Sequence, residues 1–288
     1  MANTILVGID GSRESAGAAA WALAEAEVLK WNIVFAHAVP PVDVADPQVE
    51  AGYFRGAVGE AERTFGPFLA EAEARGIPAE GQVLSGRAKD VLIRLSSRAG
   101  LVVVGRRRRT GYTSRFGSVS AALAAHSSCW TAVIPETWRQ DRSTAASVPV
   151  SSRGQFFGHI ILGVDEGPEA WSLLAVAAEM AHRHAVPLSA ITVGRDGAAQ
   201  DSASWLPDLL LRIREKHPKL QCASFTLTGT PSDKITGAAR GARLLVIGSR
   251  GLSGIPGIVR GSVSQAILER TSSPVLVVPS RPASHEHV

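Results

Sequence analysis

A glycine- and serine-rich segment in the second half of the chain has the composition of a phosphate-binding loop. Residues 248–264 contain five glycines, which let a backbone turn tightly and approach a ligand without interference from a Cβ atom. The helix expected over 262–270 would point its free N–H groups and the positive end of its dipole at an anion. Further donors are the side chains of Ser262, Ser264, Arg250 and Arg260.

This glycine-rich segment differs from the two best-known phosphate motifs. No Gly-Lys-Ser/Thr sequence follows its glycines and no GxGxxG occurs, so it is neither a Walker A loop nor a dinucleotide fingerprint. For Ser262 alone, the alternative interpretation is an ordinary helix N-cap. For a glycine-rich segment between a strand and a helix, ligand binding is the favoured interpretation.

One aspartate ends the first apolar run of each half, Asp10 in the first and Asp165 in the second. A carboxylate at this place could accept hydrogen bonds from a ribose or from an adenine amino group. The alternative is a turn or helix-cap residue, which is a common role of aspartate. The matched positions of the two aspartates leave both interpretations open.

Four segments of the first half recur in the same order in the second half. The matched segments are 4–11 with 159–166, 101–105 with 244–248, 117–120 with 261–264, and 131–135 with 275–279. Chance similarity between Val-rich strands would explain one match, whereas four matches in order indicate a tandem duplication.

Each half alternates short apolar runs with helical patterns. The expected strands are 4–9, 32–38, 78–84, 101–105 and 131–134 in the first half, and 159–164, 187–193, 220–228, 243–248 and 275–278 in the second. Helices are expected at 14–30 and at 168–184, with Pro168 in the first turn. The pattern predicts two doubly wound, five-stranded parallel-sheet α/β domains, which bind ligands beyond the carboxyl ends of their strands.

Length and composition fit two folded domains. The chain has 288 residues, of which 45% are hydrophobic. We expect domains at 1–140 and 156–280, a linker at 141–155 rich in Ser, Thr, Ala and Pro, and a tail at 281–288. The net charge of +4 permits anionic partners, but no basic stripe with a readable motif occurs, so nucleic acid is not an expected partner.

The cysteines and apolar runs indicate a soluble, cytoplasmic protein. Cys129 and Cys222 lie in different contexts, which predicts two reduced and buried thiols. The first residues enter a strand pattern without a charged leader, and no apolar run approaches the roughly 20 residues of a membrane span. The histidines, including His182 and His184, lack carboxylate or cysteine partners at ligand spacing, so we expect them to be polar side chains at the surface and to form no metal site.

Three further features have ordinary structural interpretations. Trp21 and Trp171 lie on helical faces, where packing in the core is the usual role. The stretch 39–54 is the longest irregular segment expected in the first half, and it is either a lid over the ligand crevice expected in that half or a surface loop.

The spacing Gly248-x2-Gly251-x9-Gly261-Ser262 is similar to the ATP-binding pattern of universal stress proteins. An opening strand that ends in Val164-Asp165 and the closing segment at 273–279, Ser-Pro-Val-Leu-Val-Val-Pro, also resemble that family. The resemblance covers nearly the whole chain, as a tandem pair of actinobacterial type. It implies the adenine nucleotide alpha hydrolase-like fold and binding of ATP or another adenine nucleotide.

The resemblance also implies where the nucleotide would bind. Adenine would lie near Asp165, Val193 and Ile247, and the phosphates near Gly248, Arg250, Gly251, Gly261, Ser262 and Ser264; Gly163, Val164 and Val263 complete the implied site. Mg²⁺ would arrive with the nucleotide. In this family the final strand commonly pairs with its counterpart across a dimer interface, so a tandem chain can make that pairing internally, with a homodimer as a further expectation.

The first half departs from the family pattern at its phosphate segment. Arg108 stands where the second glycine belongs, the segment between Gly105 and Gly117 is one residue shorter, and Trp130 replaces the proline found at Pro274. The weaker first-copy site comprises Asp10, Gly105, Gly117, Ser118 and Ser120. Three interpretations stay open: a degenerate site, a site for a different anion, or a solvated basic surface. We expect the nucleotide in the second copy.

The function expected from these features is a cytoplasmic, ATP-binding stress-response protein that acts through ligand-dependent conformation or association. The phosphate segment contains no Asp, Glu or His between Gly248 and Ser264, so we expect no catalytic residue there. The alternatives are an enzyme, either a slow ATPase or a nucleotidyl transferase, and an interaction module without a ligand.

Overall fold

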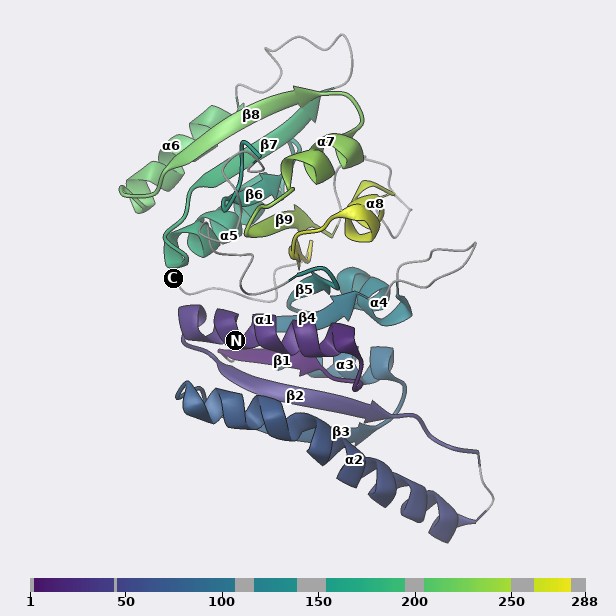
Figure 1. Ribbon diagram of the computed structural model, residues 1–288. Helices are drawn as coiled ribbons and strands as arrows, with labels where there is room; N and C mark the ends of the chain where they lie inside the picture. The colour runs from purple at the N-terminus through teal and green to yellow at the C-terminus, as the bar shows by residue number, and fades with distance from the viewer. Residues whose placement is uncertain are drawn as a thin grey trace. The chain divides into compact units, whose positions relative to one another are not determined.

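The computed structural model of the chain describes residues 3–43, 46–106, 117–138, 154–194, 205–249 and 262–280. The chain divides into two compact units after Glu136 (Figure 1). The predicted linker at 141–155 lies almost entirely outside the described residues, as does the predicted tail at 281–288.

The first unit is an α/β domain with a parallel sheet. Its described strands are β1 (Thr4–Gly8), β2 (Asn32–Val39), β3 (Ala79–Ser85), β4 (Leu101–Arg106) and β5 (Trp130–Pro135), and its described helices are α1 (Arg13–Leu29), α2 (Pro47–Ala74), α3 (Ala88–Ser96) and α4 (Ser118–His126). The strands lie in the order β3-β2-β1-β4-β5. Because the order reverses at β1 and parallel crossovers are right-handed, α1 and α2 cover one face and α3 and α4 the other.

The second unit repeats this arrangement. Its described strands are β6 (Ile160–Gly163), β7 (Leu188–Gly194), β8 (Cys222–Thr228), β9 (Leu244–Gly248) and β10 (Val275–Val278), and its described helices are α5 (Ala170–Arg183), α6 (Trp205–Lys216), α7 (Pro231–Ala238) and α8 (Ser262–Arg270). The strands lie in the order β8-β7-β6-β9-β10, and neighbouring strands are parallel. The order reverses between β6 and β9, as it does between β1 and β4.

The strands at these reversals form the centre of each sheet. Every residue of β6 and of β9 is buried. The edge strand β3 instead leaves three of its residues exposed. This difference in burial explains why the central strands are continuous apolar runs, and it confirms the predicted doubly wound parallel sheets.

The predicted strands agree with the observed ones to within two residues at each end. The predicted helix 14–30 is confirmed as α1, whose N-cap Ser12 accepts a hydrogen bond from the Ser15 N–H at 3.2 Å. The helix expected from 168 begins instead at Ala170, so the prediction that Pro168 lies in its first turn was wrong. Pro168 belongs to the turn that precedes α5.

The prediction of an irregular segment over 39–54 was also wrong for most of its length. α2 begins at Pro47, a residue suited to a first helical position. The carboxylate of Asp46 caps the helix by accepting a hydrogen bond from the Gln48 N–H at 2.8 Å. The proline and aspartate that suggest a loop therefore start a helix of 28 residues.

Both cysteines are free and buried, as predicted. Burial raises the pKa of the Cys129 thiol to about 11, so this group is a poor nucleophile at neutral pH. Trp21 is only 5% exposed, which confirms its core position. Trp171 is half-buried and lies beneath the Arg212 guanidinium, 4.0 Å from ring centroid to Cζ, so the prediction of a core position was wrong for this residue. No helix among the described residues is long and apolar enough to cross a membrane.

Candidate functional site

A cavity of about 170 Å³ opens at the carboxyl ends of β1 and β4, where the strand order of the first unit reverses. Its walls are the ends of β1, β2 and β4 and the first turns of α1, α3 and α4. The lining residues are Gly8, Ile9, Asp10, Ser12, Glu14, Ser15, Ala36, Ala38, Ala88, Leu92, Val104, Gly105, Gly117, Ser118, Val119 and Ser120. We name this cavity the first crevice. It lies where open α/β sheets bind ligands.

The first crevice contains the counterparts of most residues of the site predicted for the second half. Gly8 pairs with Ala36 in the sheet and Gly163 pairs with Ile191, so Ala38 corresponds to Val193. The repeat matches nine further residues: Gly8, Ile9 and Asp10 with Gly163, Val164 and Asp165; Val104 and Gly105 with Ile247 and Gly248; Gly117, Ser118, Val119 and Ser120 with Gly261, Ser262, Val263 and Ser264. Each of these first-half residues lines the crevice. The counterparts of Arg250 and Gly251 lie outside the described residues.

Two glycines in the first crevice lie in close packing contact with neighbouring elements. A Cβ atom on Gly105 would lie 2.4 Å from the backbone carbonyl oxygen of Glu14, so only glycine lets α1 begin this close to β4. A Cβ atom on Gly8 would lie 3.0 Å from a methyl group of Leu92. The same relation recurs in the second unit, where a Cβ atom on Gly163 would lie 3.0 Å from a methyl group of Ile235.

Asp10 takes part in the turn that starts α1. Its Oδ1 accepts hydrogen bonds from the Ser12 N–H at 3.0 Å and from the Ser12 hydroxyl at 2.5 Å. This geometry matches the turn interpretation of Asp10. The residue is exposed at the rim of the first crevice, so its carboxylate borders the cavity while it accepts these two bonds.

Asp165 has a different environment from Asp10. It is half-buried, and burial raises the pKa of its carboxyl group from 3.8 to about 6. Gly167 stands where the first half has Ser12, so the hydroxyl that donates to Asp10 has no counterpart here. A partly desolvated carboxylate gains from any ligand that brings hydrogen-bond donors.

The two ends of the glycine-rich segment in the second half meet through a buried hydrogen bond. The Ser264 hydroxyl donates to the Gly248 carbonyl oxygen at 3.2 Å. Ser249, which follows Gly248, is hydrogen-bonded to the end of β10. Its N–H donates to the Val278 carbonyl oxygen at 2.8 Å, and its hydroxyl accepts from the Ser280 N–H at 3.0 Å. Arg250, Gly251 and Gly261 lie outside the described residues.

The corresponding serine of the first half makes a more local bond. The Ser120 hydroxyl donates to the Gly117 carbonyl oxygen at 3.0 Å, within the first turn of α4. Ser118, Val119 and Ser120 line the first crevice, and the first turn of a helix carries free N–H groups, which are suited to an anion. Arg108 and the rest of the altered segment at 107–116 lie outside the described residues.

Two of the histidines expected at the surface, His182 and His184, make contacts with other side chains. His182 packs against His217, with 4.7 Å between ring centroids, and His184 accepts a hydrogen bond from Arg243 at 2.8 Å. Burial is the main cause of a lowered pKa of His217. Within the described ranges, no three His, Cys, Asp or Glu side chains are grouped so that they could hold a metal ion.

Comparison with known proteins gives a consistent result along the whole chain. Residues 1–135 and 157–279 each match the model of the Universal stress protein family. A curated universal stress protein of Mycobacterium tuberculosis is 27% identical over 317 residues, covering 97% of this chain and 96% of its own. Another, from Mycolicibacterium smegmatis, is 27% identical over 301 residues, covering 96% and 97%.

A solved structure supports the fold. The crystal structure of a universal stress protein from Archaeoglobus fulgidus matches with a TM-score of 0.74 at 20% identity, covering 97% of this chain and 99% of that chain. At 20% identity, this similarity supports the backbone fold alone.

Proposed function

We propose that this chain, which belongs to the universal stress protein family, binds an adenine nucleotide, with ATP as its ligand, and acts in a stress response through ligand-dependent conformation or association. One observation carries the proposal. The first crevice is lined by the repeat counterparts of ten of the twelve residues expected to bind the nucleotide in the second half, all except Arg250 and Gly251. The repeated sequence therefore codes for a crevice at the carboxyl edge of the sheet, where ligands bind in this fold class.

The base would be held by an apolar wall and one carboxylate. Val193 lies at the end of β7 and Ile247 in β9, on either side of β6. Asp165 follows β6 and would accept a hydrogen bond from the adenine amino group or from a ribose hydroxyl. The raised pKa of this carboxyl group reflects its poor solvation, and such a bond would replace part of the lost hydration.

The phosphates would be held at the start of α8. Ser262 begins this helix, and the bond from Ser264 to Gly248 holds the first turn of the helix against the end of β9. The N–H groups of that turn and the hydroxyl of Ser262 are suitable donors to phosphate oxygens. In the proposal Arg250, Gly251 and Gly261 complete the contact, and Mg²⁺ arrives with the nucleotide.

We assign the nucleotide to the second copy for two reasons. This copy keeps the full glycine spacing, and Asp165 has no counterpart of Ser12, whose hydroxyl donates a hydrogen bond to Asp10. We further propose that the chain forms domains at 1–140 and 156–280, that it is cytoplasmic, and that its final strands pair either within the chain or in a homodimer. Reduced thiols such as those of Cys129 and Cys222 are the ordinary state in that compartment.

An equilibrium-binding titration with ATP tests the proposal. Gly251→Arg, which introduces the residue type found at Arg108, should abolish ATP binding and leave the circular dichroism spectrum unchanged. Gly237→Arg is the matched control, because Gly237 is exposed on α7 and nothing lies within 4 Å of its Cβ position. Folded wild-type protein that binds no ATP at millimolar concentration would refute the proposal.

A further inference from the structure

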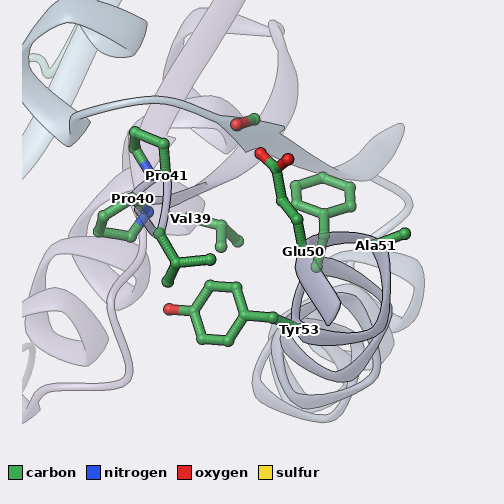
Figure 2. A pocket seen from close by; sticks show the side chains of 9 residues that line it. Val39, Pro40, Pro41, Glu50, Ala51 and Tyr53 are labelled. Atoms are coloured by element: carbon green, nitrogen blue, oxygen red, sulfur yellow. The ribbon is translucent and has the colours of Figure 1, made fainter. Parts of the chain in front are cut away.

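A second cavity of about 280 Å³ lies beside the first crevice in the same unit. It opens between the end of β2, the first two turns of α2 and the end of β3. Its lining residues are Val39, Pro40, Pro41, Val42, Glu50, Ala51, Tyr53, Phe54 and Ser85, none of which lines the first crevice (Figure 2). Consecutive strand residues point to opposite faces, so Ala38 borders the crevice and Val39 borders this second cavity.

Rigid elements fix the walls of the second cavity. Pro40 and Pro41 have restricted backbone angles and continue directly from β2. The Val39 carbonyl oxygen accepts a hydrogen bond from the Gly86 N–H at 2.8 Å, which joins the ends of β2 and β3. On the opposite wall, the Asp46 cap starts α2 and so places Glu50 one turn before Tyr53 and Phe54. These two hydrogen bonds hold the ends of the cavity walls in place.

The side chains around this space combine an apolar surface with one negative charge. Figure 2 shows Glu50 and Tyr53 on α2 facing the space from one side, with Val39, Pro40 and Pro41 across from them. Tyr53 is 46% exposed, although a ring of its size is usually better covered. The polar groups are the Glu50 carboxylate and the hydroxyls of Tyr53 and Ser85, and none of the lining residues is basic.

This chemistry selects a cation and rejects an anion. A carboxylate accepts strong hydrogen bonds from an ammonium group, and the faces of tyrosine and phenylalanine attract cations. The prolines and Val39 offer an apolar surface to the rest of a ligand, while Glu50 would repel phosphate. The volume of about 280 Å³ is at the small end for ligand pockets and limits the ligand to a small molecule.

We propose that this second cavity binds a small organic ammonium ion, whose charge pairs with Glu50 and whose apolar body lies against Tyr53 and the two prolines. This inference is independent of nucleotide binding, because the two cavities share no lining residue. It gives the first unit a ligand of its own, whichever copy holds the nucleotide.

Isothermal titration of the full chain with phenethylammonium chloride tests this inference. The ammonium compound should bind saturably at millimolar concentration, whereas 2-phenylethanol and phenylacetate, which have the same ring with a neutral or negative end, should not. Glu50→Gln should weaken binding by up to about fivefold, because Glu50 is exposed and an ion pair at an exposed position is weak. Tyr53→Leu should also weaken it, through loss of the aromatic face.

The matched control is Glu60→Gln, which removes the same charge from an exposed position further along α2 and should leave the affinity unchanged. Equal affinity for the ammonium compound and the alcohol would overturn the inference, as would wild-type binding by Glu50→Gln in folded protein. Loss of binding in Glu14→Gln with full binding in Glu50→Gln would place the amine in the first crevice and would overturn it too.

Discussion

Gly105 offers a sharp test of how the first crevice is built. In a phosphate loop a glycine at this place is usually explained by approach of the ligand, whereas here the closest neighbour is protein backbone. A Cβ atom on Gly105 would lie 2.4 Å from the Glu14 carbonyl oxygen and 2.5 Å from its carbonyl carbon. The first of these distances is about 1 Å short of the 3.4 Å at which ordinary contact begins.

The cost of Gly105→Ala follows from this geometry. The first turn of α1 would have to move away from β4, and the Ser12 cap and its bonds to Asp10 would move with it. Overpacking a core costs about 1–3 kcal/mol, and we expect the upper end, about 3 kcal/mol, because a backbone atom cannot rotate out of the way as a side chain can. The variant should unfold at a lower urea concentration than the wild type.

Gly17→Ala is the matched control, because Gly17 lies inside α1 with nothing within 4 Å of its Cβ position. This change should stabilise the chain by roughly 0.5–1 kcal/mol, since glycine disfavours a helix interior. Urea unfolding of both variants, followed by circular dichroism, should show a lower midpoint than wild type for Gly105→Ala and a higher midpoint for Gly17→Ala. If Gly105→Ala unfolds at the wild-type midpoint or above it, the packing explanation of this glycine is wrong.

Three further predictions concern single side chains. Ser12→Ala removes the cap of α1 and should cost about 1 kcal/mol in thermal unfolding; an unchanged midpoint would show that the cap contributes nothing. Burial raises the pKa of Asp165 from 3.8 to about 6, so the native state holds a proton that the unfolded chain releases, and stability falls as pH rises through this window. Asp165→Asn should therefore be more stable than wild type above pH 6 and show no advantage below pH 4, and pH-dependent unfolding without this crossover would contradict the assignment. The Cys129 thiol, buried and with its pKa raised to about 11, should resist iodoacetamide at pH 8 until the chain is unfolded, so rapid labelling of native protein would contradict its burial.

The sheets could be predicted from the sequence because their strands are buried and the chain repeats. Continuous apolar runs such as Leu101–Val104 report burial on both faces directly. Because the halves repeat, residues predicted to bind a ligand in the second half also identify the matching residues of the first half. A site predicted on Gly248 and Ser264 led to counterparts, Gly105 and Ser120, that do line a crevice. The strands are therefore marked by a local sequence pattern, and the crevice residues are marked by the duplication.

Other features depend on contacts between distant residues, so the sequence alone could not reveal them. The packing of Gly105 against Glu14 joins residues far apart in the chain, and no local pattern marks it. The start of α2 at Pro47 was missed because proline and aspartate favour both loops and helix starts. Trp171 lies on a helical face as expected, but the cation over its ring comes from Arg212 on another helix.

The central claim is that the second copy holds an adenine nucleotide, and mass spectrometry under native conditions tests it most directly. The full chain is mixed with ATP, and the nucleotides retained per chain are counted for the wild type, Gly251→Arg and the control Gly237→Arg. We predict one adenine nucleotide per chain in the wild type and the control, and none in Gly251→Arg. A folded wild-type chain that retains none, or a Gly251→Arg chain that still retains one, would contradict the claim.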